Sequence, residues 1–234
     1  MEAFTRLYPD TASGLTADDL AALVPGPAPA DRPFLLVNMI ATADGRATIA
    51  GRAGPIANRA DYELFHALRT RVDAVLVGAE TVRVESYGPM EPAAVLVTRS
   101  VNVPPEVGML RAPDNRVIVL TPSPDRELPP TAARVEYLRD DIAGGVRRLR
   151  TELGMRSVLS EGGPQILGDL MRAGLVDELH LVIAPTLAGG IDPLTIVTGA
   201  AFDPPVELRL LTVHESGGYL FLRYGAQERL DHRR

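Results

Sequence analysis

The sequence predicts an α/β fold in which one sheet is covered by helices on both faces. Three observations support this expectation. From residue 34 onward, apolar runs of four to seven residues alternate with segments that carry apolar residues at helical spacing. The runs are uninterrupted, which is typical of strands that are buried on both faces. The length of 234 residues, with 46% hydrophobic and 23% charged residues, suits one substantial core in a globular chain.

Each element is expected on its own local pattern. Buried strands are expected over residues 34–40, 74–77, 93–97, 117–120, 157–160 and 178–184. Helices are expected over residues 60–71, 141–153 and 164–173, and Gly174 is well placed to end the last of them. The β-rich runs 206–213 and 219–224 flank Gly217 and Gly218, which indicates an antiparallel hairpin that closes one edge of a mostly parallel sheet.

The chain is expected to form one domain with two minor flanking segments. Residues 1–32 are rich in Pro and Gly and have only a short helical stretch, so we expect a leader or strap over the main body. Residues 33–226 hold all the other expected elements, and residues 227–234 form a polar tail. The segment 175–190 is apolar and ends in two glycines, which favours an edge strand that pairs in a homodimer.

Composition excludes several classes of function. The absence of Cys excludes thiolate catalysis and Cys-ligated metals, and the four scattered histidines show no metal spacing. All basic side chains are Arg, so Schiff-base catalysis by Lys is excluded as well. A net charge of -6 argues against nucleic-acid binding. With no signal pattern and no apolar run of about 20 residues, we expect a cytoplasmic protein with no membrane partner.

Two expected junctions between a strand and a helix carry features of a phosphate site. Glu161, Gly162 and Gly163 follow the strand 157–160, and Pro164 opens the next helix. Free N–H groups at a helix start attract phosphate, and glycines let a ligand approach the backbone. The second junction follows the strand 74–77, where Thr81 lies near the start of a short helix. Tight turns and ordinary helix starts would use the same residues, and both interpretations stay open.

Two further strand ends carry polar side chains that could contact a ligand. Thr98, Arg99 and Ser100 follow the strand 93–97 and are suited to a terminal phosphomonoester such as the 2′-phosphate of NADP. A solvated Arg is the alternative. Thr42 and Asp44 follow the first strand and would point to one side of an extended chain, although Asp44-Gly45 is also a simple turn signal.

Four segments together resemble a known family. They are TADG at 42–45, HALR at 66–69, VGAETVR at 77–83 and SEGGPQILGDLMRAGLVDELHLVIAPTLAGG at 160–190. In this order they resemble the reductase domain of the bifunctional riboflavin-biosynthesis deaminase–reductase, a family with the three-layer dihydrofolate reductase fold. The resemblance covers roughly residues 34–224, so the segment 33–226 is expected to be a reductase domain.

The resemblance implies an NADPH-dependent reduction of 5-amino-6-(5-phosphoribosylamino)uracil to its ribitylamino product, with hydride delivered to C1′ of the ribose. The implied cofactor positions are Thr81, Glu85, Thr98, Arg99, Ser100, Gly162, Gly163, Pro164, Gln165 and Ile166. The implied substrate positions are Asn38, Thr42, Asp44, Arg69 and Glu161. Asp44 or Glu161 would handle a proton. The alternatives are a reductase of the same fold that acts on dihydrofolate or another pteridine, and a non-catalytic NADPH-binding protein.

Overall fold

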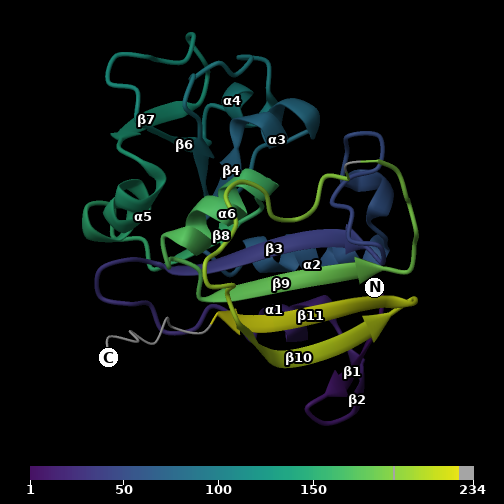
Figure 1. Ribbon diagram of the computed structural model, residues 1–234. Helices are drawn as coiled ribbons and strands as arrows, with labels where there is room; N and C mark the ends of the chain where they lie inside the picture. Colours follow the sequence, from purple (N-terminus) through teal and green to yellow (C-terminus); the bar gives the residue numbers. More distant parts are fainter. Residues whose placement is uncertain (192, 227–234) are drawn as a thin grey trace.

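The computed structural model describes residues 1–191 and 193–226, and the expected tail 227–234 lies outside the described residues. The described part of the chain forms one sheet of eleven strands in the order β2-β1-β10-β11-β9-β3-β8-β4-β5-β6-β7. Figure 1 shows the sheet running from the N-terminal strands, past the C-terminal hairpin, to the teal strands of the middle of the chain.

Seven neighbouring strands form the parallel part of the sheet. In spatial order they are β9 (Glu178–Ala184), β3 (Phe34–Thr42), β8 (Ser157–Ser160), β4 (Ala74–Gly78), β5 (Ala93–Val97), β6 (Arg116–Thr121) and β7 (Arg134–Arg139). All six strands expected from apolar runs are confirmed. β7 was not predicted, because the first four residues of this edge strand alternate between exposed and half-buried and it has no apolar run.

The C-terminal hairpin is confirmed, but it does not close the sheet. β10 (Leu208–Ser216) and β11 (Tyr219–Ala226) pair antiparallel across a turn at Gly217 and Gly218, whose φ angles are +60° and +83°. Beyond the hairpin, β1 (Phe4–Tyr8) pairs with β10, and β2 (Ala12–Leu15) forms the edge. The leader or strap expected over residues 1–32 is therefore wrong in part, since this segment extends the sheet.

The expectation that the segment 175–190 holds an edge strand is wrong, although the strand itself is present as β9. β9 pairs with β3 on one side and with β11 on the other, so its backbone groups are already bonded within the chain. Its apolar character reflects burial near the middle of the sheet, where both faces are covered. A dimer, if formed, must use another surface.

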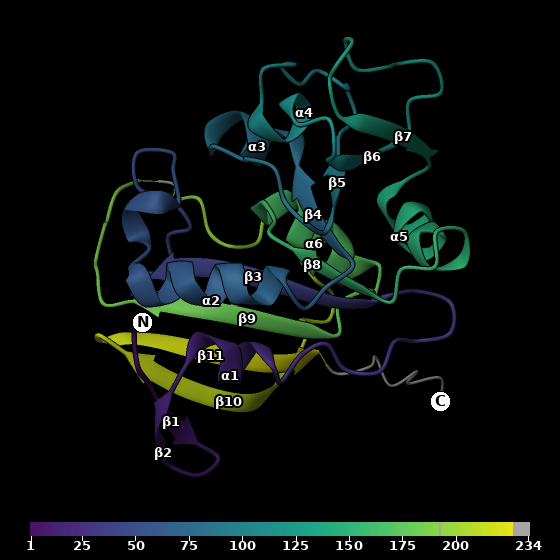
Figure 2. The same ribbon diagram turned by 180° about the vertical axis from the view of Figure 1, so that it is seen from behind.

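Helices cover both faces of the sheet and confirm the three-layer fold (Figures 1 and 2). One face carries α5 (Ile142–Thr151) and α6 (Pro164–Arg172). The other carries α1 (Ala17–Ala21), α2 (Arg59–Arg69), α3 (Ala79–Val84) and α4 (Gly108–Arg111), with a 3-10 turn η1 (Gly54–Ile56) before α2. Successive side chains of a strand point to opposite faces, so β3 contributes to the packing on both sides of the sheet. Leu35 packs in the cluster of α5 and α6, and Leu36 packs in the cluster of α2.

The helix starts follow the expected capping chemistry. The side chains of Asn58 and Asp141 accept hydrogen bonds from the first turns of α2 and α5, and Pro164 occupies the first turn of α6. The three predicted helices 60–71, 141–153 and 164–173 are confirmed to within two residues at each end. Within the described residues, no helix is both long and apolar enough to span a bilayer.

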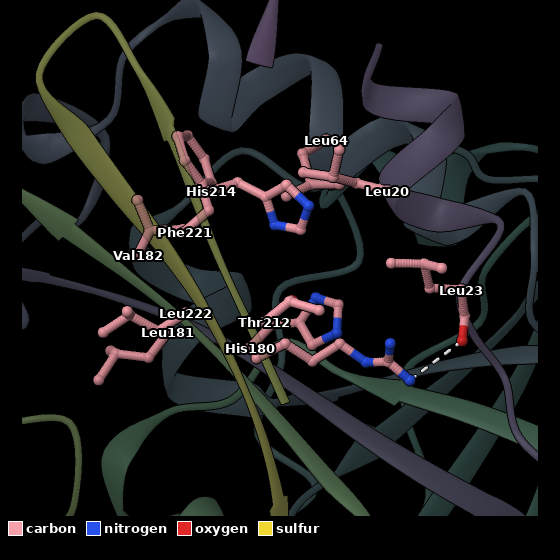
Figure 3. A pocket seen from close by; sticks show the side chains of 11 residues that line it. Leu20, Leu23, Leu64, His180, Leu181, Val182, Thr212, His214, Phe221 and Leu222 are labelled. Carbon is pink, nitrogen blue, oxygen red and sulfur yellow. Dashed lines mark hydrogen bonds between the residues drawn. The ribbon is translucent and has the colours of Figure 1, made fainter. Parts of the chain in front are cut away.

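A cavity of about 20 Å³ lies between α1 and the strands β9, β10 and β11, and two buried histidines, His180 and His214, are among the residues that line it (Figure 3). Nε2 of His180 and Oγ1 of Thr212 are buried without a hydrogen-bond partner among the described residues. Burial, together with smaller effects of the positive charges of Arg6 and Arg223, lowers the pKa of His214 to about 4. Burial also lowers the pKa of His180.

Because both histidines are buried with lowered pKa values, we expect the free energy of unfolding to decrease at acid pH. A histidine that is neutral when folded and has a pKa near 6.5 when unfolded binds more protons in the unfolded chain, so the free energy of unfolding falls as pH drops from 6.5 toward 4. We expect His214 to account for about 2–3 kcal/mol of this loss. Urea unfolding at pH 7, 5.5 and 4.5 should show a shallower decline for His214→Gln than for wild type. An identical decline would contradict the prediction.

Candidate functional site

A cavity of about 1470 Å³ extends along the carboxyl ends of the parallel strands. Its walls come from the ends of β4, β5, β6 and β8, from β3, and from one face of α2. In open α/β sheets, ligands bind at this end of the strands. The cavity is large enough for a dinucleotide and a second small molecule, whereas the cavity around His180 and His214 is far too small for either.

The two predicted glycine junctions meet in this cavity. The N–H of Gly78, at the end of β4, donates a hydrogen bond of 3.0 Å to the carbonyl of Gly162, which follows β8. Gly162 and Gly163 have φ angles of +82° and +65°, which favour glycine. A Cβ on Gly162 would lie 2.9 Å from Sδ of Met39, and one on Gly78 would lie 2.8 Å from Cδ1 of Ile166. The backbone conformation therefore favours glycine at 162 and 163, whereas Gly78 has an ordinary φ of -78° and is limited only by its contact with the side chain of Ile166.

The start of α6, which directly follows Gly163, faces the cavity. Gly163, Pro164, Gln165 and Ile166 all line it, and Gly163 offers no side chain to cap the first N–H groups of the helix. Oγ1 of Thr81, from α3, lies 3.2 Å from the position that a Cβ on Gly163 would take. The predicted Thr81 hydroxyl and the predicted helix start are thus neighbours, as a site for one phosphate group requires.

The turn after β5 presents Arg99 to the same cavity. Thr98, Arg99 and Ser100 all line it. Oγ1 of Thr98 accepts a hydrogen bond of 3.0 Å from the N–H of Val101, whose φ of +54° is unusual for a β-branched residue. Arg99 is exposed and has no hydrogen bond or ion pair with any described residue. The turn therefore uses Thr98 to hold its shape and leaves the guanidinium of Arg99 free for a ligand.

Glu161 and Arg69 form a buried ion pair on the wall of the cavity. Nε and Nη2 of Arg69 donate to the two carboxylate oxygens of Glu161 at 2.6 and 2.7 Å. The side chain of Glu161 is 2% exposed and that of Arg69 is 15% exposed. The guanidinium of Arg69 also lies 4.2 Å from the ring centre of Phe65 and 5.4 Å from that of Tyr87. The pair joins α2 to the end of β8 across 92 residues of sequence.

Burial is the largest cause of the pKa shifts of the two acidic groups on this wall, Glu161 and Tyr87. It raises the pKa of Glu161, and the hydrogen bonds from Arg69 oppose that shift. Burial also raises the pKa of Tyr87 well above its usual range, and the neighbouring Glu161 charge adds to this effect. Tyr87 therefore stays protonated at neutral pH and can donate a hydrogen bond.

The structure places Thr42 and Asp44 outside the cavity walls, where they hold a loop. The hydroxyl of Thr42 donates to Asp44 at 2.5 Å, and the N–H of Gly189 donates to the same carboxylate at 2.6 Å. These bonds and one from the N–H of Ala188 lower the pKa of Asp44 to about 2, with the Thr42 bond as the largest cause. Asp44 is exposed, and its oxygens are engaged with the loop that follows β9.

Two other predicted residues do line the cavity. Oδ1 of Asn38, on β3, is buried without a hydrogen-bond partner among the described residues. Glu85, after α3, accepts a hydrogen bond of 2.9 Å from the N–H of Ala53 and so fixes the start of η1 against the cavity rim.

Sequence reasoning missed Asp61, Phe65 and Tyr87, which also line the cavity. Asp61, Phe65 and Arg69 are spaced four residues apart, so they lie along one face of α2. This spacing in the printed sequence was the signal for the first two. For Tyr87 no local signal existed, because it follows α3 in an irregular segment and reaches Glu161 only through the fold.

Solved structures of reductases share this fold. A pyrimidine reductase-like protein from Corynebacterium diphtheriae has a TM-score of 0.74 and 22% sequence identity, covering 91% of this chain and 99% of that chain. A diaminohydroxyphosphoribosylaminopyrimidine deaminase/5-amino-6-(5-phosphoribosylamino)uracil reductase from Thermotoga maritima has a TM-score of 0.70 and 24% identity, covering 84% of this chain and 57% of that chain. The expected fold class is thereby confirmed.

Curated relatives are similar over most of the chain. The 2,5-diamino-6-ribosylamino-4(3H)-pyrimidinone 5′-phosphate reductase of Methanothermobacter thermautotrophicus is 28% identical over 214 residues, which cover 82% of this chain and 98% of the relative. The protein of the same name from Aquifex aeolicus is 27% identical over 192 residues, which cover 74% and 85%. Against the riboflavin biosynthesis protein RibD of Aquifex aeolicus, at 26% identity, the match spans 68% of this chain and only 48% of the relative.

The fold, the site and these relatives define the class of this protein as an α/β oxidoreductase. Residues 33–221 match the RibD C-terminal domain family. The chain therefore belongs to that family, and the resemblance drawn from the four sequence segments is confirmed.

Proposed function

We propose that this protein reduces the ribosylamino group of a pyrimidine precursor of riboflavin to a ribitylamino group, with NADPH as the reductant. The substrate implied by the sequence resemblance is 5-amino-6-(5-phosphoribosylamino)uracil. The relatives from Methanothermobacter and Aquifex are named for the 2,5-diamino-4(3H)-pyrimidinone counterpart. Both compounds carry the same phosphoribosylamino side chain, so the proposal applies first to this shared class.

The observation that supports the proposal most directly is the buried Glu161–Arg69 pair inside a cavity that also holds two glycine junctions. A buried guanidinium and a buried carboxylate on one wall of the cavity suit a ligand that carries both hydroxyl groups and a phosphate. The unpartnered Oδ1 of Asn38 adds an acceptor on the β3 side. We assign Asn38, Arg69 and Glu161 to the substrate.

A second group of cavity residues fits a dinucleotide phosphate. Thr81 and the helix start from Gly162 to Ile166 would hold the diphosphate, because two strand ends approach each other there with glycine backbones. Thr98, Arg99 and Ser100 would hold the 2′-phosphate, and Glu85 would shape the rim. When bound, NADPH supplies the hydride, and the protein supplies position and electrostatics.

The wall residues have separate tasks in this proposal. The guanidinium of Arg69, held in place by Glu161, binds and orients the side chain of the substrate. The hydroxyl of Tyr87 stays protonated and is a hydrogen-bond donor next to that pair. Thr42 and Asp44 act as positioning residues, because they hold the loop at Ala188 and Gly189 and do not line the cavity.

The test is a substrate panel. Oxidation of NADPH is followed at 340 nm with each of the two phosphoribosylaminopyrimidines, with dihydrofolate and with no substrate, and the ribitylamino product is identified by mass. We expect turnover with at least one of the two pyrimidines and none with dihydrofolate. Turnover with dihydrofolate alone would contradict the proposal, as would tight NADPH binding without turnover on any compound.

The expectations of a homodimer and of a cytoplasmic location stay predictions. Since β9 lies inside the sheet, a dimer needs another contact surface. The exposed apolar side chains Leu187 and Ile191, which follow β9, are candidates for that surface.

A further inference from the structure

Arg172, the last residue of α6, fastens the loop 198–202 to that helix. Its Nη1 donates a hydrogen bond of 2.9 Å to the carbonyl of Ala200, and its Nη2 donates one of 2.7 Å to Oδ1 of Asp169 on the same helix. The guanidinium also lies 5.8 Å from the ring centre of Phe202. A single planar guanidinium therefore joins the loop to the helix.

The backbone on both sides of this contact allows a close approach. The N–H of Thr198 donates a hydrogen bond of 3.2 Å to the carbonyl of Pro164, at the start of α6. A Cβ on Gly168 would lie 2.4 Å from the carbonyl oxygen of Thr198, so the loop packs directly on the backbone of the helix. Gly199 has a φ of +101°, and a Cβ there would lie 2.7 Å from Nη2 of Arg172. Glycine at both positions therefore makes this contact possible.

The contact reaches the large cavity through two residues that line it. Oδ1 of Asp169, which accepts from Arg172, also accepts a hydrogen bond of 3.0 Å from Nε2 of Gln165. Gln165 lines the cavity at the start of α6, and Thr198 lines it from the loop. Arg172 itself is not among the residues of the cavity walls. It holds the Gln165 side chain through Asp169, and it holds the loop at Thr198 through the carbonyl of Ala200.

The exposure of this contact indicates a local role. The side chains of Arg172 and Asp169 are 27% and 38% exposed, and exposed ion pairs contribute little to the free energy of unfolding. A surface loop held by few bonds opens at a small cost in free energy. A ligand that needs the loop in place must meet the cost of ordering it, so each bond that holds the loop beforehand raises affinity.

We propose that Arg172 is a positioning residue for the cofactor, because it holds Gln165 and Thr198 in place at the start of α6. This inference rests on the proposed function, which puts the diphosphate of the cofactor at that helix start. NADPH and NADH share the diphosphate, so Arg172 acts equally on both. A contact with the 2′-phosphate, as assigned to Arg99, acts on NADPH alone.

The test replaces Arg172 by Gln, which removes the planar fork that bonds Asp169 and Ala200 together. In titrations without substrate, we expect Arg172→Gln to weaken NADPH and NADH by the same factor, about threefold to tenfold. In the cofactor-free protein, the N–H of Thr198 should exchange with deuterium about threefold to tenfold faster, because its bond to Pro164 opens more often. The midpoint of urea unfolding should stay close to that of wild type.

Two further variants separate the contact from the charge of Arg172. Arg172→Lys keeps the charge but has one ammonium group in place of the planar fork, so it should weaken both cofactors as Arg172→Gln does. Gly199→Ala disturbs the same contact from the loop side and should weaken both cofactors by a similar factor. In the double variant of Arg172→Gln with Gly199→Ala, the two effects should not add, because both changes break one contact.

Arg139→Gln is a matched control. Arg139 is 28% exposed, donates hydrogen bonds to the carbonyls of Ser123 and Arg126, and lies 4.6 Å from the ring centre of Tyr137. It therefore fastens a loop with the same kinds of contact, but none of these four residues lines the large cavity. Its replacement should leave the affinity for both cofactors as in wild type.

Several outcomes contradict the inference and leave the proposed function intact. They are unchanged affinity for both cofactors in Arg172→Gln, weakening of NADPH alone, and wild-type affinity in Arg172→Lys. Faster exchange at Thr198 with no change in affinity would also overturn the inference, because Arg172 would then serve the loop and not the cofactor. If wild type binds neither cofactor, both the inference and the cofactor in the proposed function are wrong.

Discussion

Glu161→Gln is expected to lower kcat/KM for the phosphoribosylaminopyrimidine by about tenfold to a hundredfold, the effect of losing a charge-assisted hydrogen bond. The same change should lower the free energy of unfolding by about 3 kcal/mol, because it leaves the buried guanidinium of Arg69 without its counter-charge. Stopped-flow or steady-state kinetics and urea unfolding at pH 7 measure the two effects on the same preparation.

A double variant separates catalysis from stability at this pair. Replacing both charges, as in Glu161→Leu with Arg69→Met, removes the unpaired charge and restores apolar packing. We expect this double variant to unfold at a free energy within about 1 kcal/mol of wild type and to have no measurable turnover. A double variant that is stable and turns over normally would show that the pair only joins α2 to β8.

Arg99→Ala is expected to weaken NADPH binding by about tenfold to a hundredfold and to leave NADH binding nearly unchanged. Only NADPH carries the 2′-phosphate, and Arg99 stands on the cavity wall without a partner among the described residues. The effect should shrink as salt is raised, because Arg99 is exposed and its charge is screened. Titration of both cofactors into wild type and variant, at low and high salt, measures this.

A matched control exists for Arg99. Arg147→Ala removes the same charge from the exposed face of α5, away from the cavity walls, and should change neither affinity. Equal weakening of NADPH and NADH in Arg99→Ala would contradict a 2′-phosphate contact. It would instead assign Arg99 to the shape of the turn or to the diphosphate that both cofactors share.

The parallel half of the fold was predictable from the sequence because its strands are buried on both faces. Burial on both faces forces an apolar run, and such runs are readable without any knowledge of neighbours. The strands β1, β2 and β7 left no such run, since they lie at or near the sheet edges and are only half covered. β1 also pairs with β10, which follows it by about two hundred residues.

The local parts of the site were predictable for a similar reason. Gly162, Gly163 and Pro164 indicate a strand end followed by a helix start. The left-handed φ angles at 162 and 163 favour glycine, and the first turn of a helix accepts proline at 164. Thr98, Arg99 and Ser100 follow an apolar strand directly, so the strand end placed them at the cavity. These features depend on a few consecutive residues, so they could be predicted from the local sequence.

Which of these side chains come into contact depends on the long-range packing of the chain. Glu161 and Arg69 are far apart in sequence, and their pairing depends on how α2 crosses the end of β8. Asp44, for which a role at the reacting atoms stays a prediction, accepts a hydrogen bond from the N–H of Gly189, and this contact depends on where the chain returns after β9. Asp61 is without a partner for the same physical reason. Whether a buried charge is satisfied depends on long-range packing, which local pattern does not encode.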